Sequence, residues 1–219
     1  MTRTWLIALS LVAASAGGVA LVNRHEAPPT AERPRLALLT SLPLLFGEQF
    51  GLDAPKVAAV ARLERHFNIL PIATADAASL EGHTLLLMAH PRAQPAEVLV
   101  ELDAWVRRGG QVVVLADPVL QWESSRMLGD RLRPPPDFAD TGLLSHWGLR
   151  LGVDRAGEGS LRATDKRCTV RERGLVARCR VGRGHARVIA DADFVMAQGE
   201  DADRRLDLMM TELSRAESR

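Results

Sequence analysis

Aromatic residues are scarce in this chain of 219 residues: they make up 4% of it, and tyrosine is absent. Proteins that bind single-stranded nucleic acid stack bases on aromatic side chains, so this class is disfavoured. The formal net charge is only +1. A charge this close to zero also argues against broad electrostatic binding to a phosphate backbone. We therefore expect no nucleic-acid partner.

Cysteine is rarer still, and Cys168 and Cys179 are the two that occur. Zinc sites use close pairs of ligands, which this spacing does not provide. The residues between them read as two strands that turn at Arg173-Gly174, which would set Cys168 directly opposite Cys179. A disulfide is one expectation, provided that the compartment is oxidising; two small buried thiols are the alternative.

The familiar catalytic and cofactor motifs are missing from the sequence. It has no Gly-x-Ser-x-Gly elbow, no lysine-containing phosphate loop, and no Gly-x-Gly-x-x-Gly after an expected strand. An amidotransferase-like enzyme would need a cysteine on the turn near His90-Pro91, and none is there. We expect no catalytic residue, no metal and no cofactor.

Residues 84–118 form the clearest structural pattern. Two short apolar runs, TLLLMA and QVVVLA, flank an amphipathic helix that presents Val98, Leu102 and Trp105 on one face. Gly109-Gly110 supplies the left-handed residue that ends this helix. The stretch predicts a right-handed βαβ crossover.

The first segment is predicted to be a targeting signal. Arg3 precedes an uncharged run, 4–22, whose length is close to that of a spanning helix. Residues 1–22 are expected to be an uncleaved signal-anchor, with a cleaved signal peptide ending near Ala14-Ser15-Ala16 as the alternative. Residues 23–34 are read as a Pro-rich linker. The expected location is the bacterial inner membrane, with the remaining domain in the periplasm, either tethered or released.

A single α/β domain is expected over residues 35–215. The apolar run 35–42 and the shorter 68–73 read as further strands, and Pro71 places the second at an edge. Residues 161–195 alternate apolar and charged positions, as antiparallel strands do, except 186–190, which is apolar enough to rejoin the central sheet. The sequence predicts a three-layer α/β fold with a mostly parallel sheet and a C-terminal antiparallel section.

Polar residues follow the expected strands where each one ends. A ligand site at this edge would use Ser41, His90, Asp117 and Asp191. The competing interpretation is that the aspartates cap turns and that His90 is a partly buried loop residue. Asp193 suggests a metal beside Asp191, but alternate residues of a strand face opposite ways, so no metal site is predicted.

The order and spacing of several stretches resemble the auxiliary domain of GldG-type ABC transport systems, over residues 35–194. They are AHP, LDAWVRRGGQVVVLADP, LLSHWGLRL and VGRGHARVIADADF. The resemblance implies a flavodoxin-like sheet similar to that of class I glutamine amidotransferases, and contact with permease or ATPase subunits. The larger members of that family end in a second membrane helix, which this sequence does not show.

The sequence supports three functional hypotheses. The first is a non-enzymatic, membrane-tethered accessory domain of an ABC-type transport system that acts through protein contact or weak ligand binding. The second is an amidotransferase- or hydrolase-like enzyme that uses His90 and the strand-end aspartates. The third is a periplasmic ligand-binding sensor.

Overall fold

The computed structural model describes residues 33–48 and 57–218. The chain divides into two units, residues 1–32 and 33–219, and the second of them is an α/β domain. The expected membrane segment, 4–22, and nearly all of the linker lie outside the described residues. Within the described part of the chain, no helix has the length and apolar character needed to cross a membrane.

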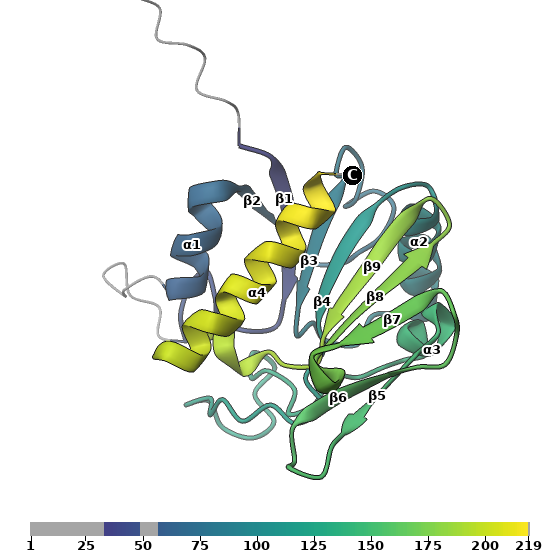
Figure 1. Cartoon of the computed structure of the whole chain (residues 1–219). Coiled ribbons are helices and arrows are strands. Elements are labelled where there is room, and N and C mark those ends of the chain that lie inside the picture. The colour runs from purple at the N-terminus through teal and green to yellow at the C-terminus, as the bar shows by residue number, and fades with distance from the viewer. Residues whose placement is uncertain (1–32, 49–56, 219) are drawn as a thin grey trace, which may run out of the picture. The chain divides into compact units, whose positions relative to one another are not determined.

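A seven-stranded sheet forms the centre of the domain, in the order β2-β1-β3-β4-β9-β8-β7 (Figure 1). The first five strands in this order are parallel, whereas β8 and β7 run antiparallel to their neighbours. The strands are β1 (Arg35–Thr40), β2 (Asn68–Pro71), β3 (Leu85–Ala89), β4 (Gln111–Leu115), β7 (Cys168–Arg171), β8 (Val176–Val181) and β9 (Gly184–Ile189). The mostly parallel sheet and its C-terminal antiparallel section are as the sequence predicted.

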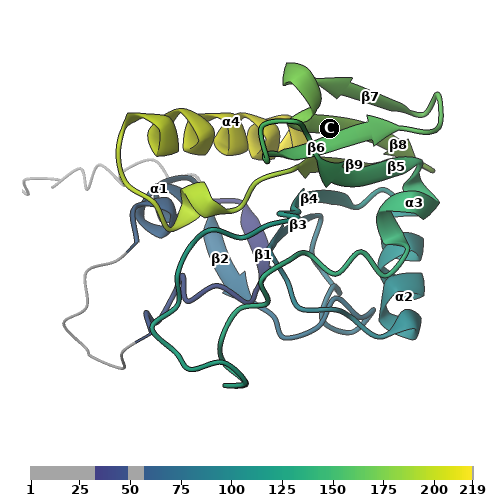
Figure 2. The ribbon, with the colours of Figure 1, turned by 90° about the horizontal axis from the view of Figure 1, so that it is seen from below.

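Helices cover both faces of this sheet. Helices α1 (Ala58–His66) and α4 (Glu200–Glu217) bury apolar side chains against one face, and α2 (Ala96–Arg107) and α3 (Leu143–Trp147) against the other (Figure 2). The central strands are buried on both sides, which explains why they read as unbroken apolar runs rather than alternating ones. A separate two-stranded antiparallel sheet, β5 (Leu149–Val153) and β6 (Gly159–Ala163), completes the domain with the 3₁₀ turns η1 (Glu172–Gly174) and η2 (Asp193–Val195).

The predicted βαβ crossover is confirmed as β3, α2 and β4. Val98, Leu102 and Trp105 are buried on the inner face of α2. Gly109 has φ +125°, the left-handed conformation that ends the helix. A Cβ at Gly110 would lie 2.4 Å from the Trp105 ring, so that position must be glycine for the indole to pack under the turn.

The C-terminal section contains one correction. Cys168 pairs with Cys179 across β7 and β8, and a disulfide joins them. The turn between these strands is not the two-residue turn expected at Arg173-Gly174. It spans residues 172–175, because the last strand pair is Arg171 with Val176. Cys168 still lies opposite Cys179, because the longer turn takes one additional residue from each of the two strands.

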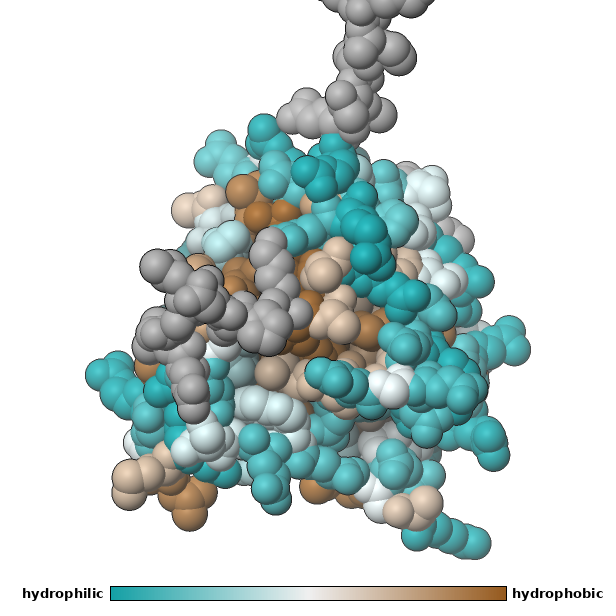
Figure 3. All heavy atoms as spheres, turned by 90° about the vertical axis from the view of Figure 1, so that its left-hand side faces the viewer, coloured by the Kyte–Doolittle hydropathy of each residue, from teal (hydrophilic) through white to brown (hydrophobic). Residues whose placement is uncertain are grey.

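Strand β2 lies at one edge of the sheet, and among the described strands it pairs only with β1. Its Ile69 and Leu70 are half-buried. The side of the domain that carries α1 and β2 is mostly hydrophilic, with apolar atoms gathered near its middle (Figure 3). The edge position that Pro71 predicted is confirmed, but the strand ends at Pro71 itself rather than at residue 73.

Candidate functional site

The strand-end residues singled out from the sequence lie along one edge of the sheet. Ser41 follows β1, His90 follows β3, Asp117 comes two residues after β4, and Asp191 two residues after β9. These four strands are parallel neighbours in the order β1-β3-β4-β9, so their carboxyl ends share this edge. It is the edge at which open α/β sheets usually bind ligands.

Ser41 and His90 are committed to holding β1 against β3. The Ser41 hydroxyl donates a hydrogen bond of 2.5 Å to the main-chain oxygen of His90. One residue earlier, the Thr40 hydroxyl donates to the Ala89 oxygen at 2.8 Å. Both hydroxyl protons therefore stabilise the backbone of the neighbouring strand end.

His90 is fully buried and adopts φ +46°, a conformation that few residues other than glycine adopt. Its Nε2 lies 3.0 Å from the main-chain oxygen of Pro135. A carbonyl oxygen only accepts hydrogen bonds, so Nε2 carries the proton and donates it. No described residue forms a hydrogen bond with Nδ1. The imidazole thus binds a distant loop and has no exposed surface to offer a ligand.

Asp117 plays a similar part between β4 and β9. Its Oδ1 accepts a hydrogen bond from the Val119 amide and its Oδ2 one from the Ala192 amide, both at 2.9 Å. Its main-chain oxygen accepts from the Phe138 amide at 2.7 Å. Asp117 therefore ties both ends of the segment between Val119 and Phe138 to the sheet.

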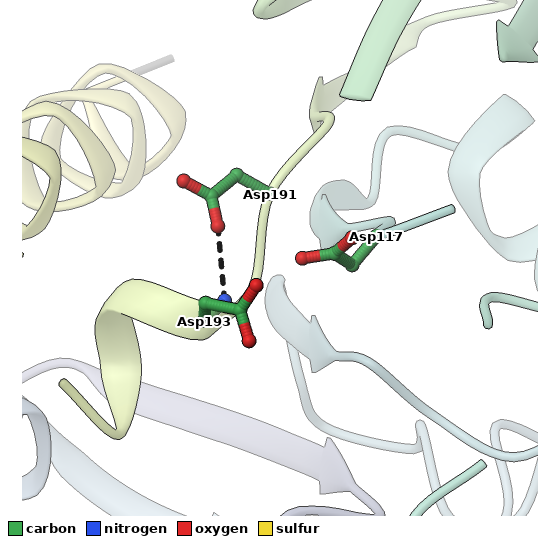
Figure 4. Close-up of side chains that lie close together, drawn as sticks. All are labelled: Asp117, Asp191 and Asp193. Atoms are coloured by element: carbon green, nitrogen blue, oxygen red, sulfur yellow. Dashed lines mark hydrogen bonds between the residues drawn. The ribbon is translucent and has the colours of Figure 1, made fainter. Parts of the chain in front are cut away.

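Asp117, Asp191 and Asp193 converge, with one carboxylate oxygen of each within 4.8 Å of the others (Figure 4). The expectation that Asp191 and Asp193 face opposite ways is wrong, because β9 ends at Ile189 and strand alternation does not apply beyond it. Burial raises the pKa of Asp191 to about 6, although Arg205, whose Nη1 lies 2.8 Å from Asp191 Oδ2, opposes this. Burial likewise raises the pKa of Asp193.

Three carboxylates are the ligand type that magnesium and calcium prefer. Here, however, they already accept hydrogen bonds from the protein. Asp193 accepts from the Gln121 and Trp122 amides at 2.9 and 2.6 Å, and Asp191 Oδ1 accepts from the Asp193 amide at 2.9 Å. These hydrogen bonds and the ion pair with Arg205 engage the carboxylates of Asp191 and Asp193. The main effect of the cluster is to hold the loop that follows β4.

We call residues 119–137 the rim loop. Besides the bonds from His90, Asp117 and Asp193, its middle is held by Glu48, which accepts hydrogen bonds from the Ser124 hydroxyl and, at 2.6 Å, from the Ser125 amide. Burial opposes ionisation of Glu48, but these hydrogen bonds together lower its pKa below the ordinary value. The rim loop is thus an irregular segment with a fixed course (Figure 1).

The tip of the rim loop exposes apolar side chains. Met127 is 83% exposed, Leu128 88% and Leu132 56%. At the base of the loop, by contrast, Leu120 and Trp122 pack against the core. The loop is therefore anchored by its base and presents an apolar tip to its surroundings.

Two contributors to this edge carried no signal in the sequence. Glu48 and Ser124 are 76 residues apart, and Arg205 lies inside a helix where its charge resembles that of any surface residue. Only the folded chain places them next to the rim loop and Asp191.

Solved structures that resemble this chain do so at low sequence identity. No protein-family model matches the sequence, and no curated protein matches it. Among solved structures, an exo-β-1,4-mannosidase from Opitutaceae bacterium strain TAV5 is similar at 13% identity and a TM-score of 0.43, over 83% of this chain and 34% of that one. A β-galactosidase from Rahnella sp. R3 is similar at 14% identity and a TM-score of 0.42, over 83% of this chain and 32% of that one.

A smaller neighbour is a cytoplasmic protein from Salmonella typhimurium LT2, with 9% identity and a TM-score of 0.46 over 81% of this chain and 95% of that one. This chain spans about a third of the length of the two glycosidases. Likeness at this distance carries no information on activity.

Proposed function

We propose that this protein is a non-enzymatic, membrane-tethered accessory domain of an ABC-type transport system, and that it docks on a membrane subunit through the tip of the rim loop. The supporting observation is that side chains at the strand ends hold the rim loop in place. His90, Asp117 and Asp193 direct their polar atoms to the backbone of the rim loop, whose tip exposes Met127 and Leu128.

An apolar tip on a fixed loop suits protein contact. Large exposed apolar side chains that cluster on an ordered surface mark interaction sites, and methionine is enriched at interfaces. A loop already held in one conformation also loses less entropy on binding than a free one. Arg131 is exposed beside the tip, while Arg126 is paired with Asp130. The matching partner surface is apolar, with an acidic group opposite Arg131.

The strand order supports a flavodoxin-like sheet of the kind found in class I glutamine amidotransferases. Its five parallel strands follow the order 2-1-3-4-5 when numbered among themselves, with the switch point between β1 and β3. A flavodoxin-like protein would bind its ligand there. In this chain the Ser41–His90 hydrogen bond spans that point.

The uncharged segment 4–22 supplies the proposed attachment to the membrane, and the Pro-rich linker sets the distance between the membrane and the domain. The resemblance to GldG-type auxiliary domains names the partner class, a permease or its associated ATPase. Of these two, the permease is the proposed partner, because a domain held outside the cytoplasmic membrane can contact a subunit that crosses the membrane.

Site-specific photo-crosslinking tests this proposal. A benzophenone side chain is introduced at Leu128 in the full chain, and a matched one at Val100, which is 69% exposed on α2 and remote in sequence from the rim loop. We expect a covalent adduct with the permease of an ABC-type system from position 128 only. The change Leu128→Asp should abolish co-purification with that permease, whereas Val100→Asp should not.

Equal adducts from both positions, or none from position 128, would refute docking through the tip. Turnover of a small substrate that depends on His90 would refute the non-enzymatic role.

A further inference from the structure

The domain contains a second feature that the rim loop does not explain. A cavity of about 490 Å³ lies beside the end of β9, within the range of about 300–1,000 Å³ typical of small-molecule sites. The turn between β5 and β6 contributes Asp154 and Glu158, η1 contributes Glu172 and Arg173, and α4 contributes Arg205. Four separate parts of the chain therefore converge on it, with Ala190 at its floor.

The walls of this cavity are fixed by close backbone approaches. A Cβ at Gly159 would lie 1.9 Å from the Ala190 oxygen, so the start of β6 touches the end of β9. A Cβ at Gly174 would lie 2.4 Å from the Ser160 hydroxyl and 3.5 Å from the Leu161 amide nitrogen, so η1 also contacts β6 closely. These approaches fix how β6 lies against β9 and η1, the elements that frame the cavity, while its charged side chains Glu158, Glu172 and Arg173 are exposed.

The two charged residues of η1 are held in an unfavourable conformation. Glu172 and Arg173 both have φ +54°, in the left-handed region that side chains other than glycine, asparagine and aspartate seldom adopt. If these positions only formed a tight turn, glycine, asparagine or aspartate would adopt this conformation at a lower energetic cost. Backbone strain of this kind is often found where side chains are positioned for binding.

The charges around the cavity are of both signs. Glu158 and Glu172 supply carboxylates, and Asp154 supplies a third whose Oδ1 already accepts hydrogen bonds from the Ala156 and Glu158 amides. Arg173 and Arg205 supply guanidinium groups, of which Arg205 is already paired with Asp191 at 2.8 Å. A ligand with one sign of charge would be attracted by part of the wall and repelled by the rest. A ligand with separated opposite charges satisfies both parts.

We propose that this cavity binds a short peptide with free ends, its ammonium group facing the carboxylates of the β5–β6 turn and its carboxylate facing Arg173. The volume exceeds what a single amino acid would fill, and the absence of an aromatic side chain from the described lining disfavours a sugar stacked on a ring. Arginine binds a carboxylate through two parallel hydrogen bonds, which would fix the carboxyl end. This inference does not depend on docking by the rim loop.

Two substitutions remove one charge each with little risk to the fold. Arg173→Gly deletes the guanidinium at a backbone conformation that glycine adopts freely. Glu158→Gln removes a carboxylate from an exposed turn residue whose backbone amide, bonded to Asp154, is unchanged. Arg180→Ala, at an exposed position of β8 away from the cavity, is the matched control.

Calorimetric titration of the full chain in detergent tests the proposal with four probes: L-alanyl-L-alanine, its N-acetyl form, its C-terminal amide, and the form blocked at both ends. We expect the free dipeptide to bind at least tenfold more tightly than the doubly blocked form. Arg173→Gly should weaken binding of the free and N-acetyl dipeptides at least tenfold, because both have a free carboxylate. Glu158→Gln should weaken binding of the free and amide dipeptides, because both have a free ammonium group. Arg180→Ala should change the binding of none of the probes.

Three results would overturn the proposal. They are the lack of saturable binding by the free dipeptide, equal binding by the doubly blocked form, and equal loss in the Arg180→Ala control. The first is checked against the circular dichroism spectrum and thermal midpoint of the same sample, so that an unfolded preparation is recognised and replaced. A failure of crosslinking at Leu128 leaves each of these measurements unaffected, so the two proposals fail separately.

Discussion

Replacing Asp191 by asparagine is the most direct test of the electrostatics at the carboxyl edge. Asp191 is 14% exposed, lies within reach of Asp117 and Asp193, and has Arg205 as its counter-ion. Asparagine keeps the oxygen that accepts the Asp193 amide but cannot ionise. Arg205 is 34% exposed and is free to turn toward water.

The size of the effect follows from the pKa of Asp191, which burial raises from 3.8 to about 6. One pKa unit is worth about 1.4 kcal/mol, so ionising this buried carboxyl costs the folded state about 3 kcal/mol. The folded state holds the proton more tightly than the unfolded chain does. The stability that this proton confers is therefore fully present below pH 3.8 and is lost as the pH rises to about 6.

Urea unfolding of the full chain and of Asp191→Asn, measured from pH 4 to pH 8, provides the assay. The difference in free energy of unfolding should move in favour of the variant by about 2.5 kcal/mol between pH 4 and pH 8, because part of the total of about 3 kcal/mol is already lost at pH 4, and it should level off above about pH 6.5. Asp201→Asn is the control, because Asp201 is 85% exposed and its change should stay below about 1 kcal/mol at every pH. A difference that is flat with pH, or that moves against the variant, would refute the account of a destabilising buried charge.

Three further predictions concern stability. Replacing Cys168 and Cys179 by serine removes a cross-link between residues 11 apart in sequence and should cost about 3 kcal/mol, seen as a lower urea midpoint that reductant no longer shifts. Glu212→Gln should cost about 3 kcal/mol or more, because Glu212 is fully buried against arginine side chains that would lose their counter-charge; the urea midpoint of the variant checks this. Asp193→Ala should speed hydrogen exchange of the Trp122 amide at least tenfold and leave the sheet amides unchanged, since only the rim loop loses an acceptor.

Features that depend on neighbours in sequence could be predicted. The βαβ crossover follows from two apolar runs, a helical stripe that includes Trp105, and Gly109-Gly110, all within one stretch. The Cys168–Cys179 register follows from a hairpin, in which a symmetric change of turn length leaves the pairing unchanged. In both cases the information is local, and tertiary contacts reinforce it.

Features that depend on residues distant in sequence could not be predicted. The alternation argument for Asp191 and Asp193 assumed that the strand continues, whereas β9 ends at Ile189 and the chain turns into η2. Where a strand ends depends on what its neighbour, β4, can pair with, and the sequence of β9 does not contain this. The hydrogen bond that the Ser124 hydroxyl donates to Glu48 across 76 residues has no local signature of any kind.

Position at the carboxyl edge is therefore insufficient to make a polar residue a ligand-binding one. Asp117, Asp193 and His90 occupy the places where a doubly wound sheet usually presents its binding groups, yet their side-chain atoms bond to backbone groups of the rim loop and, for Asp117, also to the Ala192 amide. A buried acceptor that already has its donors gains little from a ligand and loses much if the donor is displaced. Exposed charged side chains such as Glu158 and Arg173 instead line the cavity beside the end of β9, where we propose that a ligand binds, whereas the apolar tip of the rim loop is where we propose that a protein partner docks.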